Sequence, residues 1–98
     1  MSTDLYKLAD SVETEEDFIR FIDVLMKDKI DEEGKEATTE SNRWGTGPNG
    51  WENSSLTGFL ESAHAWANVS INGFDGYRKP TNPWRRAAQI LHAGKFYE

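Results

Sequence analysis

The chain has 98 residues and a formal net charge of −6 at pH 7, with 37% hydrophobic residues, 29% charged residues and no cysteine. A chain of this length builds one modest core, so a single helical domain spanning residues 1–98 is expected. The lack of cysteine excludes disulfides, thiolate zinc sites and a cysteine nucleophile. No apolar run approaches the ~20 residues of a membrane span, and the N-terminus lacks a basic region followed by an apolar stretch. The sequence therefore predicts a cytoplasmic protein without membrane insertion or secretory export.

The charge is distributed unevenly along the chain. Residues 1–40 contain 13 acidic and 5 basic side chains, whereas residues 41–98 contain 4 acidic and 6 basic ones. An acidic surface repels the phosphate backbone of nucleic acids and attracts basic proteins. Nucleic-acid binding is therefore not expected, and a basic protein partner is favoured.

The N-terminal part of the chain shows two helical patterns. Residues 4–12 predict a short helix, because their apolar residues recur at spacings of three and four. A second helix is predicted over residues 15–33, with the Thr14 hydroxyl as its N-cap and Gly34 as its end. Its predicted core residues are Phe18, Phe21, Ile22 and Leu25.

Residues 35–50 lack periodicity and are rich in helix-breaking residues, so a long loop is predicted there. Loops of more than about 12–15 residues are usually either functional or disordered. Trp44, beside Arg43, is the one large apolar side chain of this stretch. Because tryptophan is enriched at protein interfaces, Trp44 is a candidate for partner binding.

A third helix is predicted over residues 54–68, capped by Asn53, and it is expected to be the central helix of the domain. Gly58 lies within it, which predicts close approach of another helix or of an aromatic ring at that point. Its expected apolar stripe consists of Leu56, Phe59, Leu60, Ala63, Trp66 and Ala67.

The C-terminal part contains an irregular stretch and a last helix. Residues 70–81 hold two turn-forming dipeptides, which give weak support to a short β-ribbon. A helix is predicted over residues 83–93, with Asn82 as N-cap, Pro83 in the first position and Gly94 at its end. The predicted fold is all-α: a small bundle of three principal helices with a short N-terminal helix and two long loops.

The residues that carry chemistry form no recognisable catalytic or metal-binding signature. His64 and His92 lie on different predicted helices without a metal-ligand spacing, and a structural role is favoured for both. The glycine-rich stretch at 45–50 lacks the lysine of a phosphate-binding loop. The sequence thus predicts no catalytic residue, no metal site and no cofactor.

An acidic cluster lies near the end of the second predicted helix. This cluster lacks the oxygen-ligand spacing and the glycine of a calcium loop, so a calcium site is not predicted. Two interpretations of the cluster remain: a solvated helix end, or a patch that faces a partner. For the second interpretation, the expected contact residues are Asp23, Asp28, Asp31, Glu32, Glu33 and Trp44.

In combination, several short motifs resemble a family of small bacterial proteins of unknown function. These motifs are Leu8-Ala9-Asp10, Asp17-Phe18, Trp51-Glu52-Asn53, Leu56, Phe59-Leu60-Glu61, Ala65-Trp66, Pro83-Trp84, Ala88-Gln89-Ile90-Leu91 and Tyr97-Glu98. The resemblance covers nearly the whole chain and implies no known reaction. Such relatives run almost directly from the second helix to the Trp-Glu-Asn segment, so the resemblance implies extra residues around Lys35–Gly50 in this chain.

These observations favour a non-enzymatic protein-binding domain. The leading hypothesis is a bacterial immunity protein that covers the active site of a basic toxin such as a nuclease. The alternative is a structural or regulatory interaction module, in which acidity serves only solubility. A third class, an enzyme, would require a site built from Glu61, His64 and a neighbouring acid. The oligomeric state stays open at this stage.

Overall fold

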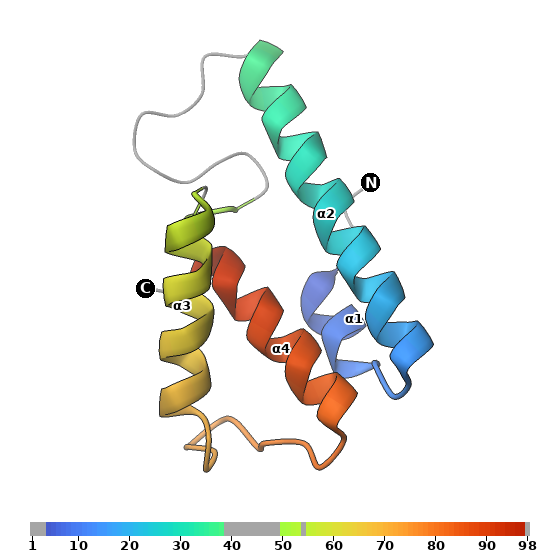
Figure 1. Ribbon diagram of the computed structural model, residues 1–98, viewed down its shortest axis with the longest axis vertical. Coiled ribbons are helices and arrows are strands. Elements are labelled where there is room, and N and C mark those ends of the chain that lie inside the picture. The colour runs from blue at the N-terminus through green and yellow to red at the C-terminus, as the bar shows by residue number, and fades with distance from the viewer. Residues whose placement is uncertain (1–3, 39–49, 54, 98) are drawn as a thin grey trace.

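The computed structural model describes residues 4–38, 50–53 and 55–97, and for residues 35–38 the description is limited to the helical backbone. These described residues form four helices, α1 (Leu5–Asp10), α2 (Glu15–Thr38), α3 (Leu56–Val69) and α4 (Pro83–Phe96) (Figure 1). In the described part of the chain, β structure is limited to an isolated bridge between Phe74 and Tyr77. The predicted all-α fold is therefore confirmed, and the weakly supported ribbon is reduced to this one bridge.

Two helix starts follow the predicted capping. The Thr14 hydroxyl accepts a hydrogen bond from the Asp17 amide at 3.1 Å, and the Asp17 carboxylate accepts one from the Glu13 amide at 3.1 Å. At α4, the Asn82 side chain accepts from the amides of Trp84 and Arg85 at 2.9 and 3.1 Å. Both caps satisfy amides that lack a partner within the helix, so each helix begins where the sequence predicts.

The predicted helix ends at glycine are wrong. α2 continues through Gly34 to Thr38, which shortens the predicted loop at its start, and α4 continues through Gly94 to Phe96. Gly94 is needed for packing instead of termination, because a Cβ there would lie 2.8 Å from a ring carbon of Phe59. Only a residue without a side chain permits this approach of α3 to α4.

The predicted start of α3 is also corrected. Ser55, not Asn53, is the N-cap, and its hydroxyl accepts a hydrogen bond from the Gly58 amide at 3.0 Å. A Cβ on Gly58 would meet Ser55 Oγ at 3.0 Å and Asn53 atoms at 3.7 Å and beyond. Gly58 therefore lies against the cap of its own helix, and the predicted contact with another helix or ring is not present among the described residues.

The central helix is α4, not α3 as predicted. α4 packs against each of the other three helices, α1 also packs against α2, and α3 contacts α4 alone among the described helices. Figure 1 shows α4 between α3 on one side and α1 with α2 on the other. The upper part of α2 extends beyond the ends of the other helices, which contributes to a longest dimension of 42 Å against 26 and 22 Å for the others.

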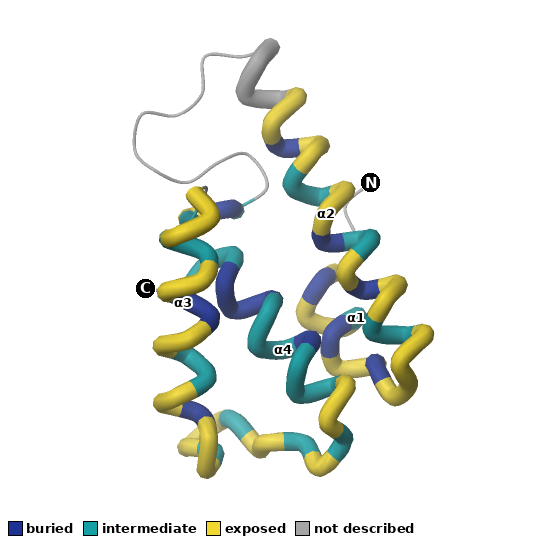
Figure 2. The backbone as a smooth tube through the Cα atoms, in the orientation of Figure 1, coloured by how far each residue is buried: buried dark blue, intermediate teal, exposed yellow. Residues whose placement is uncertain are grey.

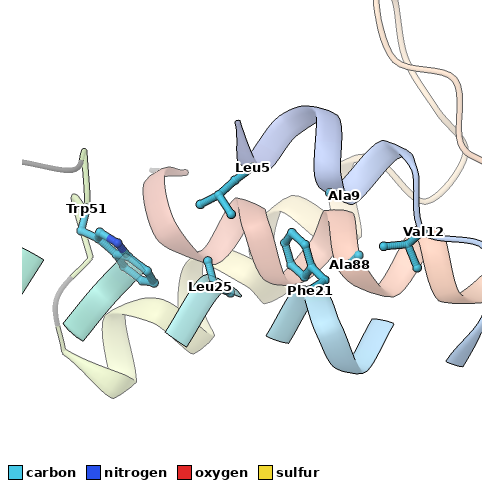
Figure 3. Packing of buried hydrophobic residues seen from close by; sticks show 7 residues of the cluster. All are labelled: Leu5, Ala9, Val12, Phe21, Leu25, Trp51 and Ala88. Carbon is cyan, nitrogen blue, oxygen red and sulfur yellow. The ribbon is translucent and has the colours of Figure 1, made fainter. Parts of the chain in front are cut away.

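The core lies where α1, α2 and α4 meet (Figure 3). Phe21 and Ala88 are 0% exposed and form its centre. The other buried members of the cluster are Leu5, Ala9, Val12, Leu25 and Trp51. Three residues predicted for the apolar faces are instead at the surface, since Ile22 is 42%, Leu56 74% and Leu60 55% exposed.

His92 belongs to the interior, in keeping with the structural role that the sequence favours. It is 5% exposed, and its ring packs edge-on against Tyr6 at 4.4 Å and Phe96 at 5.0 Å between centroids. Burial, and then the nearby Lys95 ammonium, lower the pKa of His92 to about 4. The imidazole is therefore neutral at pH 7.

Candidate protein-binding surface

Five of the six predicted contact residues lie on α2, and Trp44 lies outside the described residues. The structure divides these five into two groups. Asp28 and Glu32 point toward the body of the protein and contact Trp51, while Asp23, Asp31 and Glu33 lie at the surface. The two groups therefore have different roles.

Asp28 holds the indole of Trp51. One carboxylate oxygen accepts hydrogen bonds from Trp51 Nε1 and from Lys95 Nζ, both at 2.8 Å. The indole also stacks on Phe59, with 6.2 Å between centroids, and the ammonium groups of Lys29 and Lys95 lie 5.6 and 5.5 Å from its ring centroid. Such cation–π and charge-assisted contacts fix Trp51 between α2 and α4.

Glu32 is 1% exposed, so it does not belong to an acidic surface patch as predicted. Its carboxylate accepts a hydrogen bond from the Trp51 amide at 3.2 Å and pairs with the Lys29 ammonium at 3.3 Å. A carboxylate can be buried when it is paired and hydrogen-bonded in this way. Together with Asp28, it braces the projecting half of α2.

The Trp51-Glu52-Asn53 segment also closes the C-terminus of α4. The amides of Glu52 and Asn53 donate to the Lys95 carbonyl at 3.0 and 3.3 Å. The Asn53 side-chain amide donates to the carbonyls of Gly94 and Tyr97, both at 3.1 Å. Carbonyls at a helix C-terminus lack partners within the helix, so this segment supplies them from outside.

The outer side of α2 carries an apolar stripe, here called the outer stripe, which consists of Ile19, Ile22, Met26 and Ile30. These side chains are 57%, 42%, 50% and 56% exposed, respectively. Their spacings of three and four place them on one helix face. The core residues Phe18, Phe21 and Leu25 occupy a different face of the same helix. Figure 2 shows buried and exposed positions alternating along α2.

Acidic residues border the outer stripe. Glu15, Glu16, Asp23, Asp31 and Glu33 are exposed or partly exposed, and among them Asp23 pairs with Lys27 at 2.9 Å. Only Arg20 and Lys27 are exposed cations on the described side chains of α2. The surface therefore combines apolar contact area with net negative charge.

The outer stripe is the feature that sequence reasoning missed. Ile22 was assigned to the core because it lies four residues after Phe18, yet the same residue lies three after Ile19 and four before Met26. The outer stripe forms a second apolar series, with spacing i, i+3, i+7, i+11, along the same helix. Two such series in one helix indicate two apolar faces, so the sequence does contain a signal for the stripe.

The residues considered for catalysis are not gathered into a site. Glu61 and His64 are both exposed on α3, and the His64 ring interacts with the Asn68 amide at 3.3 Å. Across the described residues, no three histidine, aspartate or glutamate side chains come together as metal ligands would. In the same part of the chain, none of the helices is long and apolar enough to span a membrane.

The fold and this surface define a small all-α protein with a braced helix that is apolar on two faces. The chain belongs to the family of unknown function DUF7660, whose model matches residues 14–98. Membership in a family of unknown function is therefore confirmed, while the individual motifs stay a prediction. The matched region begins just before α2, so α1 precedes it. No curated protein and no solved structure matches the chain.

Proposed function

We propose that this chain is a non-enzymatic binding protein that uses the outer stripe of α2, with its acidic border, to contact a basic protein partner. The observation that carries the proposal is the exposure of four large apolar side chains on one face of a helix whose other face is in the core. Contiguous exposed apolar surface usually marks an interaction site.

The charge around the stripe selects the chemistry of the partner. Among the described side chains of α2, four acids (Glu15, Glu16, Asp31 and Glu33) and two cations (Arg20 and Lys27) are fully exposed, so the potential there is negative. A basic protein would be steered toward it and would associate faster at low salt. We propose that the chain is a bacterial immunity protein. Such a protein needs an acidic surface in order to cover the active site of a basic toxin such as a nuclease.

A second copy of the chain fits the outer stripe less well. A two-fold dimer places the same patch of both copies face to face, so the acidic borders would meet each other. Like charges in an interface cost free energy. The remaining alternative is a structural or regulatory module that binds by the apolar residues alone, and it predicts association rates that do not depend on salt.

The proposal is tested with the protein that this chain captures from the cells that produce it. The captured protein is expressed alone and together with this chain, and growth is measured. We expect the captured protein to be toxic alone and harmless in the presence of this chain. If the captured protein is not toxic, the immunity role is contradicted. The assignment of the binding surface is tested separately, by the association kinetics described next.

The kinetic test uses charge reversal at the exposed acids. Asp31→Lys combined with Glu33→Lys should slow association roughly tenfold at low ionic strength and much less at high salt, because steering is screened. The control combines Glu61→Lys with Asp75→Lys, which makes the same change in net charge at exposed positions away from α2. Equal slowing by both pairs would refute a specific role for the α2 surface.

A further inference from the structure

A groove lies on the side of the molecule formed by α1, α4, Trp66 of α3 and the connection from α3 to α4. Its volume is about 880 Å³, and among the described residues none of α2 lines it. The floor includes Ala9 and Ala93, whose small side chains leave the space open, and both are 1% exposed. A volume of this size is within the range of small-molecule sites.

Aromatic rings line much of the groove. Tyr6 and Phe96 lie together with 5.5 Å between centroids, and Tyr77 contacts Trp66 and Phe74 at 5.0 and 5.3 Å. Aromatic faces of this kind bind planar apolar molecules by stacking or edge contacts.

Hydrogen bonds fix the wall that contains Tyr77. Arg86 donates to the Tyr77 hydroxyl at 3.1 Å, Tyr77 donates to Gln89 Oε1 at 2.5 Å, and Gln89 Nε2 donates to Asp10 at 3.0 Å. The same arginine also donates to the Ser70 hydroxyl at 2.9 Å and to the Ala67 carbonyl at 3.0 Å. This chain of bonds joins α1, α4 and the connection before α4, so the groove is formed in advance of any ligand.

The groove is positively charged although the whole chain has a formal charge of −6. Its lining contains the cations Arg78, Lys79 and Arg85 and a single acidic residue, Asp10. Arg85 is engaged by the Val12 carbonyl and by Glu13. Arg78 and Lys79 are exposed and form no hydrogen bond or ion pair with any described residue, so both are available to an anion.

We propose that this groove is a binding site for a small planar aromatic molecule that carries one negatively charged group. The aromatic part packs against the Tyr6, Phe96 and Tyr77 rings, and the charge lies beside Arg78 and Lys79. The site is independent of the partner surface on α2, since the two share no described residue. A carboxylate and a phosphate ester satisfy the same chemistry.

The test is a titration followed by amide chemical shifts, with 2-naphthoate and its neutral isostere 2-naphthamide as probes. We expect saturable shifts at the amides of Ala9, Gly76 and Ala93, and roughly fivefold tighter binding of the anion, as two exposed ion pairs of ordinary strength would give. A third probe, 2-naphthyl phosphate, distinguishes the anion: whichever of the two charged probes binds tighter identifies the class of ligand.

Two matched variants decide whether the named cations are responsible. Arg78→Gln with Lys79→Gln should reduce the affinity for 2-naphthoate to that for 2-naphthamide. Arg20→Gln with Lys27→Gln removes two exposed cations from α2 and should leave the preference unchanged. Absence of saturable binding, equal affinity of the charged and neutral probes in the unaltered protein, or shifts that map to α2 would each overturn the proposal.

Discussion

Glu32 and Glu33 are neighbours in sequence whose carboxylates lie in opposite environments. Glu32 is 1% exposed and bonded to Trp51 and Lys29, whereas the Glu33 side chain is 61% exposed. Glu32→Gln should lower the free energy of unfolding by about 1–3 kcal/mol, because it removes the nearer and buried one of the two carboxylates that pair with the mostly buried Lys29 ammonium. Glu33→Gln should change it by less than ~0.5 kcal/mol.

Urea unfolding of the two variants measures this difference. Since both replacements remove one negative charge from the same turn of α2, a general electrostatic effect would act on both alike. Equal free energies of unfolding for the two variants would show that Glu32 does not brace the helix.

His92 makes stability depend on pH in a defined window. The imidazole of the unfolded chain takes up a proton near pH 6.5, whereas burial lowers the pKa of the folded His92 to about 4. Between these values the unfolded state binds more protons, so stability falls as the pH falls. The contribution of His92 should be about 3 kcal/mol from pH 7 to pH 4, at ~1.4 kcal/mol per pKa unit.

His92→Gln removes this titration, so its stability should vary less over the same window than that of the unaltered protein. His64→Gln is the control, because His64 is exposed on α3 and its replacement should leave the dependence in place. The account of His92 fails if the difference in unfolding free energy between the unaltered protein and His92→Gln is the same at pH 7 and at pH 4.

At the scale of the helices, two glycines within helices should respond to alanine in opposite ways. Gly34 is exposed on α2, and no described atom lies within 4 Å of a Cβ placed there. Gly34→Ala should therefore raise the free energy of unfolding by up to about 1 kcal/mol, the difference in helix propensity. Gly94→Ala should lower it by about 1–3 kcal/mol, because the new methyl group overlaps the Phe59 ring.

Thermal unfolding distinguishes the two effects directly. A raised midpoint for Gly94→Ala would mean that Phe59 moves aside without cost and that α3 and α4 do not require glycine at their contact. A lowered midpoint for Gly34→Ala would show that α2 does not continue as a regular helix at this residue.

The sequence predicts two of the helix starts correctly. The caps at Thr14 and Asn82 depend on atoms within four residues, so they are visible in the chain itself. The sequence does not show which face of α2 enters the core. Phe18, Phe21 and Ile22 fit one apolar series, and Ile22 also fits a second. Only the packing of α1 and α4 decides which series is buried.

The candidate site is also predictable only in part, because the burial of α2 side chains depends on contacts with residues far away in the sequence. The acidic residues of α2 indicate the helix that carries the proposed surface, but burial of Glu32 depends on Trp51, 19 residues further on. The contact of Trp51 Nε1 with Asp28 spans 23 residues, and that of Asn53 with Gly94 spans 41. Contacts over such separations leave no periodic signal in the sequence.

At the scale of the whole molecule, the contacts that hold the helices together and the proposed binding surface lie on different faces. α4 contacts all three other helices, and the Trp51 segment joins α2 to the end of α4. Among the described residues, the four side chains of the outer stripe do not belong to the core cluster. The second apolar face of α2 lies outside the core, so it is suited to contact a partner. Because the helix is already folded, it would lose little conformational entropy on binding.

This separation gives the central prediction. Ile22→Ser with Met26→Ser should leave the free energy of unfolding within ~1 kcal/mol of the original value, because both side chains are at the surface. The matched control is Leu56→Ser with Leu60→Ser, which removes two exposed leucines from α3.

The decisive measurement is the dissociation constant of each double variant with the captured partner, determined by calorimetry. The account predicts that the α2 variant binds roughly 30-fold or more weakly, as loss of two central apolar contacts would require, while the α3 control binds like the unaltered protein. Unchanged affinity of the α2 variant, or an equal loss in the α3 control, would contradict the assignment of the outer stripe as the binding surface.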